Sequence, residues 1–188
     1  MIRSAFLSLV ASLCLMLPLG ACGDAGPEAD ASRAAAVFYD IVLSERSGGV
    51  PGEDLRARLR PVISPDLDSL IAQAAEAERR HTERTDNAEP PYLQGDIFSS
   101  LFEGPTAYEI GPCEQIEEGG ATFTRCDVML VHEGDEPVQW KDRVILSAHG
   151  GAAERRWLVD DIRYGGDWDF AMKGSLKETL RAVIAEEE

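Results

Sequence analysis

The spacing of apolar residues changes near residue 106, and this change constrains the fold more than any other feature. Before that point, apolar residues recur every three or four positions over 32–46 and 65–81, which predicts two amphipathic helices. After it come four segments rich in β-branched and aromatic residues, separated by glycine-containing turns: 106–113, 121–132, 137–148 and 155–164. These segments predict an antiparallel meander.

Shorter signals complete the order of elements. Residues 53–59 are expected to form a short helix, and residues 96–102 one helical turn. Ser175 with Glu178 three residues later is a capping box, which predicts a closing helix. The chain is therefore expected to adopt an α+β fold, with N-terminal helices packed on one face of a curved, four-stranded antiparallel meander and a C-terminal helix.

The spacing of Cys113 and Cys126 predicts a disulfide bond. Gly119-Gly120 is typical of a two-residue hairpin turn in which both residues have positive φ. Antiparallel pairing across that turn places the two cysteines opposite each other, with Cα atoms about 4.5 Å apart. This separation lies in the disulfide range. A redox-active pair is the alternative, but the chain has no C-x-x-C motif.

The N-terminus has the three parts of an export signal. Arg3 is followed by an apolar stretch, which ends in Leu19-Gly20-Ala21-Cys22. That run resembles the lipobox of bacterial lipoproteins, and the resemblance implies cleavage before Cys22 and lipid modification of its sulfur, including palmitate. The alternative is an ordinary signal peptide with a chance cysteine. We expect a signal peptide over 1–21, a flexible tether over 22–31 and one α+β domain over 32–188.

A lipid-modified Cys22 predicts where the protein resides. Each buried acyl methylene contributes about 0.8 kcal/mol, so two or three chains hold a protein to a bilayer. We expect a lipid-anchored protein of the bacterial cell envelope that faces the periplasm. An Asp directly after the lipidated cysteine favours the inner membrane in enterobacteria. Gly23 stands there and Asp24 follows it, which slightly favours the outer membrane.

The charge of the chain limits its partners. The formal net charge is −16, and it becomes −17 after loss of residues 1–21, which contain Arg3 and no acidic residue. Nucleic-acid binding is excluded, because the phosphate backbone demands a basic face. The expected partners are the membrane, through the lipid on Cys22, and an envelope protein or a basic periplasmic protein. Solubility alone also explains the acidic surface.

Two short motifs carry a family resemblance. They are Phe38-Tyr39 in the first helix and Trp157-Leu158-Val159-Asp160-Asp161-Ile162 in the last strand, with Gly174-Ser175-Leu176 beyond them. Together with the order of elements, they resemble a family of uncharacterised bacterial lipoproteins and exported proteins with a domain of unknown function. The resemblance covers residues 34–184 and implies the cone-like fold called nuclear-transport-factor-2-like, or cystatin-like. It implies no mechanism.

Metal and cofactor motifs fail one by one. The histidines are isolated from one another: His81, His132 and His149. His132-Glu133 begins like H-E-x-x-H, but Glu136 stands where the second histidine would be. A calcium loop that starts at Asp160 would need Glu at the position of Ala171. We therefore predict no metal, no cofactor and no catalytic residue.

The interior of the cone is the candidate pocket. Asp161 and Trp157 are four residues apart, so they share one face of a regular strand, and Asp160 lies on the other face. One of the two aspartates is expected to point at a pocket together with Tyr39 and Trp140, where burial would raise its pKa and make it a base. The alternative is that both carboxylates cap backbone amides or pair with Arg143 or Arg163.

Three functions follow from these patterns. The first is non-enzymatic binding of a protein or small ligand by a lipid-anchored periplasmic domain, one version of which is an inhibitor that protects the cell against a basic toxin. The second is an enzyme that uses Asp160 or Asp161 as a base in the cone pocket. The third is a structural lipoprotein of the envelope. The absence of catalytic motifs favours the first.

Overall fold

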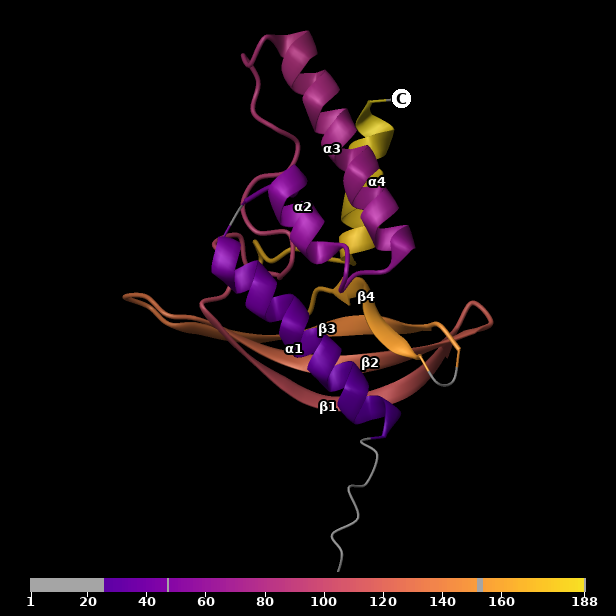
Figure 1. Ribbon diagram of the computed structural model, residues 1–188. Helices are drawn as coiled ribbons and strands as arrows, with labels where there is room; N and C mark the ends of the chain where they lie inside the picture. Colours follow the sequence, from indigo (N-terminus) through magenta and orange to yellow (C-terminus); the bar gives the residue numbers. More distant parts are fainter. Residues whose placement is uncertain (1–25, 47, 152–153, 188) are drawn as a thin grey trace, which may run out of the picture.

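The computed structural model describes residues 26–46, 48–151 and 154–187. In chain order the elements are α1 (Pro27–Glu45), α2 (Glu53–Leu59), α3 (Pro65–Thr85), β1 (Ala107–Glu118), β2 (Ala121–His132), β3 (Val138–His149), β4 (Arg156–Arg163) and α4 (Leu176–Glu186). Figure 1 shows a curved sheet with the helices on one side of it. The predicted α+β architecture is therefore confirmed. The curvature is consistent with the cone-like, nuclear-transport-factor-2-like shape, which stays a prediction.

Helix α1 begins at Pro27 rather than at residue 32. Proline is favoured at the first helical position, and Glu28 and Asp30 lie in the first turn, where the helix dipole stabilises negative charge. Ala31 is already fully buried. The predicted tether over 22–31 therefore overlaps the first turns of a packed helix from Pro27 onward, and Cys22 itself lies outside the described residues.

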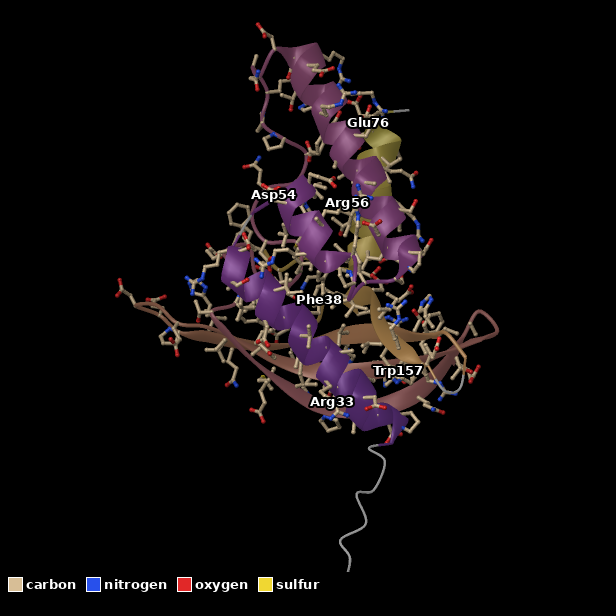
Figure 2. All side chains as sticks on the ribbon, in the orientation of Figure 1. Arg33, Phe38, Asp54, Arg56, Glu76 and Trp157 are labelled. Carbon is tan, nitrogen blue, oxygen red and sulfur yellow. A yellow bond between two sulfur atoms is a disulfide. The ribbon has the colours of Figure 1, made fainter. Side chains whose placement is uncertain are left out.

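Helices α2 and α3 are joined by a forked ion pair. Arg56 of α2, labelled in Figure 2, donates from Nε and Nη2 to the two carboxylate oxygens of Asp68 on α3, at 2.7 and 3.1 Å. Ser64-Pro65 has the cap residue and following proline that predict a helix start, and Ser64 does cap α3 by accepting a hydrogen bond from the Leu67 amide at 3.1 Å. Helix α3 continues past residue 81 and ends at Thr85.

The loop between α3 and β1 contains no helical turn over residues 96–102, so that prediction is wrong. The Asp96 amide instead donates to the Phe102 carbonyl at 2.7 Å, which closes the segment into a compact loop. Four consecutive residues from Ile97 to Ser100 are buried in it. Side-chain oxygens accept the amide hydrogen bonds that a helix would have made internally: the Phe98 amide donates to Asp96, the Ser100 amide to Asp142 and the Leu101 amide to Ser99.

The four strands pair in the order β1-β2-β3-β4, each antiparallel to the next. Side chains on the inner face of the sheet meet Phe38 and Tyr39 of α1 and form the core. This inner set comprises Cys126, Val128 and Leu130 of β2, Trp140, Val144 and Leu146 of β3, and Val159 and Ile162 of β4. Alternation along β2 puts every second residue into this core, which is the pattern of a sheet covered on one face.

Two irregularities bend the sheet. One lies in β1 between Ile110 and Cys113, where the pairing with β2 shifts. The other lies in β4, where Val159 pairs with Leu146, Asp161 pairs with Ile145, and Asp160 is the extra residue between them. A bulge adds one unpaired residue and increases the local twist and bend.

The disulfide between Cys113 and Cys126 is present, as predicted. Their Cα atoms are 4.0 Å apart. The pairing of β1 with β2 continues without a shift from Glu118 and Ala121, next to the turn, to the two cysteines. Gly119 and Gly120 have φ values of 58° and 80°, as the hairpin turn requires. The bond therefore closes the β1–β2 hairpin beside the bulge in β1.

Helix α4 is capped by Ser175, whose hydroxyl accepts a hydrogen bond from the Glu178 amide at 3.3 Å. Its buried residues Leu180 and Val183 face α3, and the two helices stand side by side away from the sheet (Figure 1). Within the part of the chain that the structure describes, no helix combines the length and apolar character that a membrane span needs.

Candidate functional site

Tyr39 and Trp140, two of the predicted pocket residues, belong to the closed core. The ring of Tyr39 stacks on Tyr108, with centroids 5.4 Å apart, and its hydroxyl has no hydrogen-bond partner among the described residues. Burial, followed by the negative charge of Asp142, raises the pKa of Tyr39 well above its usual value. The indole Nε1 of Trp140 donates to Asp142 Oδ2 at 3.1 Å. Neither residue contributes to the wall of the cavity described below.

Asp160 and Asp161 fasten α4 to β4 and the start of α3. Asp160 Oδ2 accepts from Lys177 Nζ at 2.7 Å, and the same ammonium donates to Asp66 at 2.6 Å. Asp161 Oδ1 accepts from the backbone amides of Lys177 and Ile162, both at 2.9 Å. Burial raises the pKa of Asp161, and the hydrogen bonds oppose that shift. The cation beside Asp160 is therefore Lys177, and neither Arg143 nor Arg163 takes that place.

The bulge in β4 explains why these aspartates do not meet the predicted pocket. Because Asp160 is an extra residue, the inward positions run from Trp157 and Val159 to Ile162, and Asp161 no longer shares the face of Trp157. Figure 2 shows Trp157 on β4, where it packs against the rim of the core. The structure thus places Tyr39, Trp140 and Trp157 in or against the core, and the two aspartates outside it.

A buried carboxylate that the sequence did not single out lies at the centre of the molecule. Asp142 on β3 is fully buried and accepts four hydrogen bonds. The donors are the Ser100 amide at 2.8 Å, the Ser100 hydroxyl, the Gly165 amide at 2.8 Å and the Trp140 indole. Ser100 Oγ in turn accepts from the Gly165 and Gly166 amides, both at 3.0 Å. This network ties the 95–106 loop and the segment after β4 to the sheet.

One cavity lies at the C-terminal end of α1, between α1, α2 and the 95–106 loop. Its volume is about 220 Å³. The apolar part of its wall comes from all three elements: Val42, Leu43, Leu55, Phe98 and Phe102. Phe102 is 56% exposed, so the ring stands where the cavity meets solvent. The cavity therefore has an apolar wall and an accessible edge, and sequence reasoning did not predict it.

Glycines allow the 95–106 loop to approach the helices closely. Gly95 has a φ of 69°, and a Cβ on it would lie 2.5 Å from the Phe102 carbonyl oxygen. The Gly49 amide donates to the Gly95 carbonyl at 2.6 Å, which joins the loop to the segment before α2. A Cβ on Gly104 would lie 3.0 Å from Cβ of Asp96. Because glycine has no Cβ at these two positions, the loop can close up on itself, and Asp96 becomes part of the cavity wall.

Asp96 is the unusual polar group of this cavity. Its Oδ1 accepts from the Phe98 amide at 3.2 Å, whereas its Oδ2 is shielded from solvent and has no partner among the described residues. Burial is the main reason that the pKa of Asp96 rises from 3.8 to about 6; hydrogen bonds from the Ser99 side chain and from the Phe98 and Ile97 amides oppose this rise, and the charge of Asp142 adds to it. An unpaired buried carboxylate oxygen is costly unless something binds it. Burial therefore makes the ionised form of Asp96 costly in the folded protein.

Other polar groups lie around the cavity. The Nδ1–H of His132 donates to the Gly104 carbonyl at 2.7 Å, since a carbonyl can only accept. Thr106 Oγ1 donates to the Val131 carbonyl at 3.2 Å and accepts from the Glu133 amide at 2.9 Å. Arg46 and Glu103 are exposed lining residues of opposite charge. Across residues 26–46, 48–151 and 154–187, no group of three or more His, Cys, Asp or Glu side chains is placed to hold a metal ion.

A comparison with known proteins adds one relative. The chain is 27% identical over 161 residues to a protein of Escherichia coli (strain K12) named uncharacterized lipoprotein YbjP, and the match covers 86% of this chain and 79% of the relative. No family model matches the chain, and no solved structure matches it at a significant level. The similarity supports a lipoprotein of unknown function.

Proposed function

We propose that this protein is a lipid-anchored lipoprotein of the cell envelope whose periplasmic domain binds a small ligand without catalysing a reaction. The cavity at the C-terminal end of α1 carries the proposal. Its wall is mostly apolar and holds a few polar groups, which is the composition of small-molecule sites in general. The sequence predicts a domain that binds a protein or a small ligand, and the cavity favours the small ligand.

The chemistry of the cavity favours binding over catalysis. Among its described lining residues, none is a cysteine, serine or lysine, and the hydroxyl of Thr106 already donates to a backbone carbonyl. His132 uses one ring nitrogen to hold the Gly104 carbonyl. Asp160 and Asp161, the bases of the enzymatic alternative, are bound by Lys177 and by backbone amides. A base with a matched acid or nucleophile is therefore not assembled in the cavity.

The lipid anchor rests on the lipobox-like run that ends at Cys22 and on the lipoprotein relative. Attachment through acyl chains would leave the whole folded domain free to face the periplasm. Labelled palmitate should appear on the wild-type protein and not on the Cys22→Ser variant. Equal labelling of both proteins would contradict the anchor.

Ligand binding is tested by filling the cavity. The mature chain with Cys22→Ser, which carries no lipid and needs no detergent, is screened by ligand-observed NMR against a library of small aromatic and aliphatic compounds. Leu43→Trp replaces a side chain of the cavity wall with a larger, aromatic one, and it should abolish binding of the compounds that bind the wild type. Val37→Trp is the matched control, because Val37 is an exposed residue of the same helix outside the cavity wall. Hits that survive Leu43→Trp would place binding elsewhere.

A further inference from the structure

We infer that the open edge of β1 binds an extended, positively charged segment of another protein, which pairs with β1 as an additional strand of the sheet. The part of β1 concerned is residues 113–118, beside the hairpin turn. None of these residues lines the cavity, so this surface is separate from the proposed ligand site and does not depend on it. The inference rests on backbone groups without partners and on the charge around them.

The two edges of the sheet differ. The edge of β4 is covered, because the Ser64 amide donates to the Val159 carbonyl at 2.8 Å and the Val159 amide donates to the Val62 carbonyl at 2.9 Å. Further along β4, Arg163 forms an isolated bridge with Ser175. Strand β1 pairs with β2, and no other segment of the described residues pairs with it. The open edge of the sheet is therefore β1 (Figure 1).

The register shows which backbone groups of β1 point away from β2. Glu118 and Ala121 flank a two-residue turn, so they form a hydrogen-bonded pair, and pairs of this kind alternate along the strands with pairs that are not hydrogen-bonded to each other. The N–H and C=O groups of Glu117, Gln115 and Cys113 consequently point away from the sheet. Among the described residues, none hydrogen-bonds to these groups. Gln115 and Glu117 are exposed, so an incoming strand can reach them.

This segment has strand geometry before any partner binds. The Cys113–Cys126 disulfide fixes its start, and pairing with β2 runs without a shift from there to the turn. Pro112 has no N–H and lies in the irregularity between Ile110 and Cys113, which disfavours pairing of a partner with the preceding part of β1. A partner strand should therefore pair over 113–118, a length of about 20 Å.

The charge of the β1–β2 hairpin favours a basic partner. Residues 107–132 contain five acidic residues and one basic residue, Arg125, which gives a formal net charge of −4. The acidic residues are Glu109, Glu114, Glu117, Glu118 and Asp127. Glu114 and Glu118 contact arginines of the same sheet, whereas Glu117 contacts no cation among the described residues. A Lys or Arg side chain beside Glu117 would therefore meet negative charge that is not yet paired.

A second copy of the chain fits this edge less well. Pairing of two β1 edges would place glutamates of one copy beside glutamates of the other, and like charges on facing strands are destabilising. The formal net charge of the whole chain is −16, which adds repulsion between copies. An extended basic segment supplies the missing donors and acceptors and has the opposite charge. This is the mode of binding known as strand addition.

The first test uses a peptide of seven alternating lysine and valine residues, blocked at both ends, and the mature chain with Cys22→Ser. The amides of Gln115 and Glu117 should exchange their hydrogens rapidly in the free protein, and roughly tenfold or more slowly when the peptide is bound. Amide hydrogen exchange followed by NMR measures both rates. A peptide in which glutamate replaces every lysine should leave the two rates unchanged. The lysine–valine peptide N-methylated at every internal amide keeps its charge and should lose the protection.

The second test changes the edge without changing the charge. Gln115→Pro removes one outward N–H and no hydrogen bond to β2, so it should lower the affinity for the lysine–valine peptide by about fivefold or more. Gln115→Ala is the matched control and should stay within about twofold of the wild type. Fluorescence anisotropy of the labelled peptide measures the affinities, and circular dichroism checks the fold. The N-methylated peptide tests the same hydrogen bonds on the unchanged protein.

The outcomes separate strand addition from attraction by charge alone. Unchanged exchange of the two amides, or equal affinity for the N-methylated peptide, would overturn the proposal. Equal binding of the glutamate peptide would refute the choice of a basic partner. A dimer of the wild type that sedimentation detects and that Gln115→Pro abolishes would show that a second copy occupies the edge instead. Slower exchange of both amides, with weaker binding to Gln115→Pro than to Gln115→Ala, supports the proposal.

Discussion

Asp142 is fully buried, whereas Asp96 is half-buried with one oxygen shielded from solvent, and the hydrogen bonding of the two carboxylates differs. Asp142 accepts four hydrogen bonds from three separate segments of the chain, including the 95–106 loop and the segment after β4. Asp96 lies on that same loop, and one of its oxygens accepts none from the described residues. The first carboxylate is complete inside the fold, and the second lies at the wall of a cavity.

The difference separates structural from binding roles. A buried charge that is fully hydrogen-bonded holds its partners together, and its removal leaves those donors unsatisfied. A buried charge with an empty acceptor lowers stability until a ligand or water supplies the missing donor. The two aspartates should therefore respond to substitution in opposite directions.

Loss of Asp142 should have the largest effect. Asp142→Ala leaves the Ser100 amide, the Ser100 hydroxyl and the Trp140 indole without this acceptor and removes one of the two acceptors of the Gly165 amide, so we expect the free energy of unfolding to fall by about 3–5 kcal/mol. Urea unfolding followed by tryptophan fluorescence measures the loss. Ser69→Ala removes a hydroxyl from an exposed site on α3 and should change stability by less than about 0.5 kcal/mol. A loss below about 1 kcal/mol for Asp142→Ala would show that Asp142 does not have the structural role that separates it from Asp96.

Asp96→Asn should stabilise the protein, and only at neutral pH. In the folded state the pKa of Asp96 is raised from 3.8 to about 6. Below about pH 4 both folded and unfolded states hold the proton, so the carboxyl costs nothing there. Between about pH 4 and pH 6 the unfolded chain releases the proton while the folded protein keeps it, so stability falls across this window by up to about 3 kcal/mol relative to the variant and stays at the lower level above pH 6.

The measurement is the difference in urea midpoint between wild type and Asp96→Asn at pH 4 and pH 7.5. The charged and titratable groups that face Asp96 must stay the same in both proteins: Tyr39, Asp142, Tyr164, Arg46, Glu103 and His132. Repeating the pair with His132→Asn removes any contribution of that imidazole. A wild type more stable than the variant at pH 7.5 would show that Asp96 has a partner in the fold.

The smallest effects are expected at the paired aspartates of β4. Asp161→Asn keeps the oxygen that accepts from the Lys177 and Ile162 amides, so stability should change by about 1 kcal/mol or less. Binding of any ligand in the cavity should stay within about twofold of the wild type, because neither Asp160 nor Asp161 lines it. Calorimetric titration of Asp160→Asn and Asp161→Asn checks this. A large loss of binding in either variant would show that Asp160 or Asp161 belongs to the functional site after all.

The fold was predictable because its signals are local. Apolar spacing located the helices, glycine pairs located the turns, and counting outward from Gly119-Gly120 gave the Cys113–Cys126 bond. The serine caps at Ser64 and Ser175 marked two helix starts. Each of these features depends on residues within about a dozen positions of one another, where periodicity and turn chemistry are informative.

The site was not predictable, because its contacts join distant segments. Asp142 meets Ser100 and Gly165 across long stretches of chain, and no local pattern records that meeting. The alternation of Trp140 with Asp142 did place both on one inward face, and this was the one available signal. At Asp160, a bulge shifted the alternation by one residue and moved Asp161 off the predicted face. Hydrophobic periodicity does not reveal a single extra residue.

The early start of α1 at Pro27 bears on how the protein stands at the membrane. Between a lipid on Cys22 and Pro27 the chain can reach at most about 17 Å, so the first turn of α1 stays close to the bilayer surface. A helix from Pro27 to Glu45 is about 28 Å long. The cavity lies at its far end, beside Val42 and Arg46. The end of α1 that follows the proposed lipid anchor is therefore the end opposite the proposed ligand site.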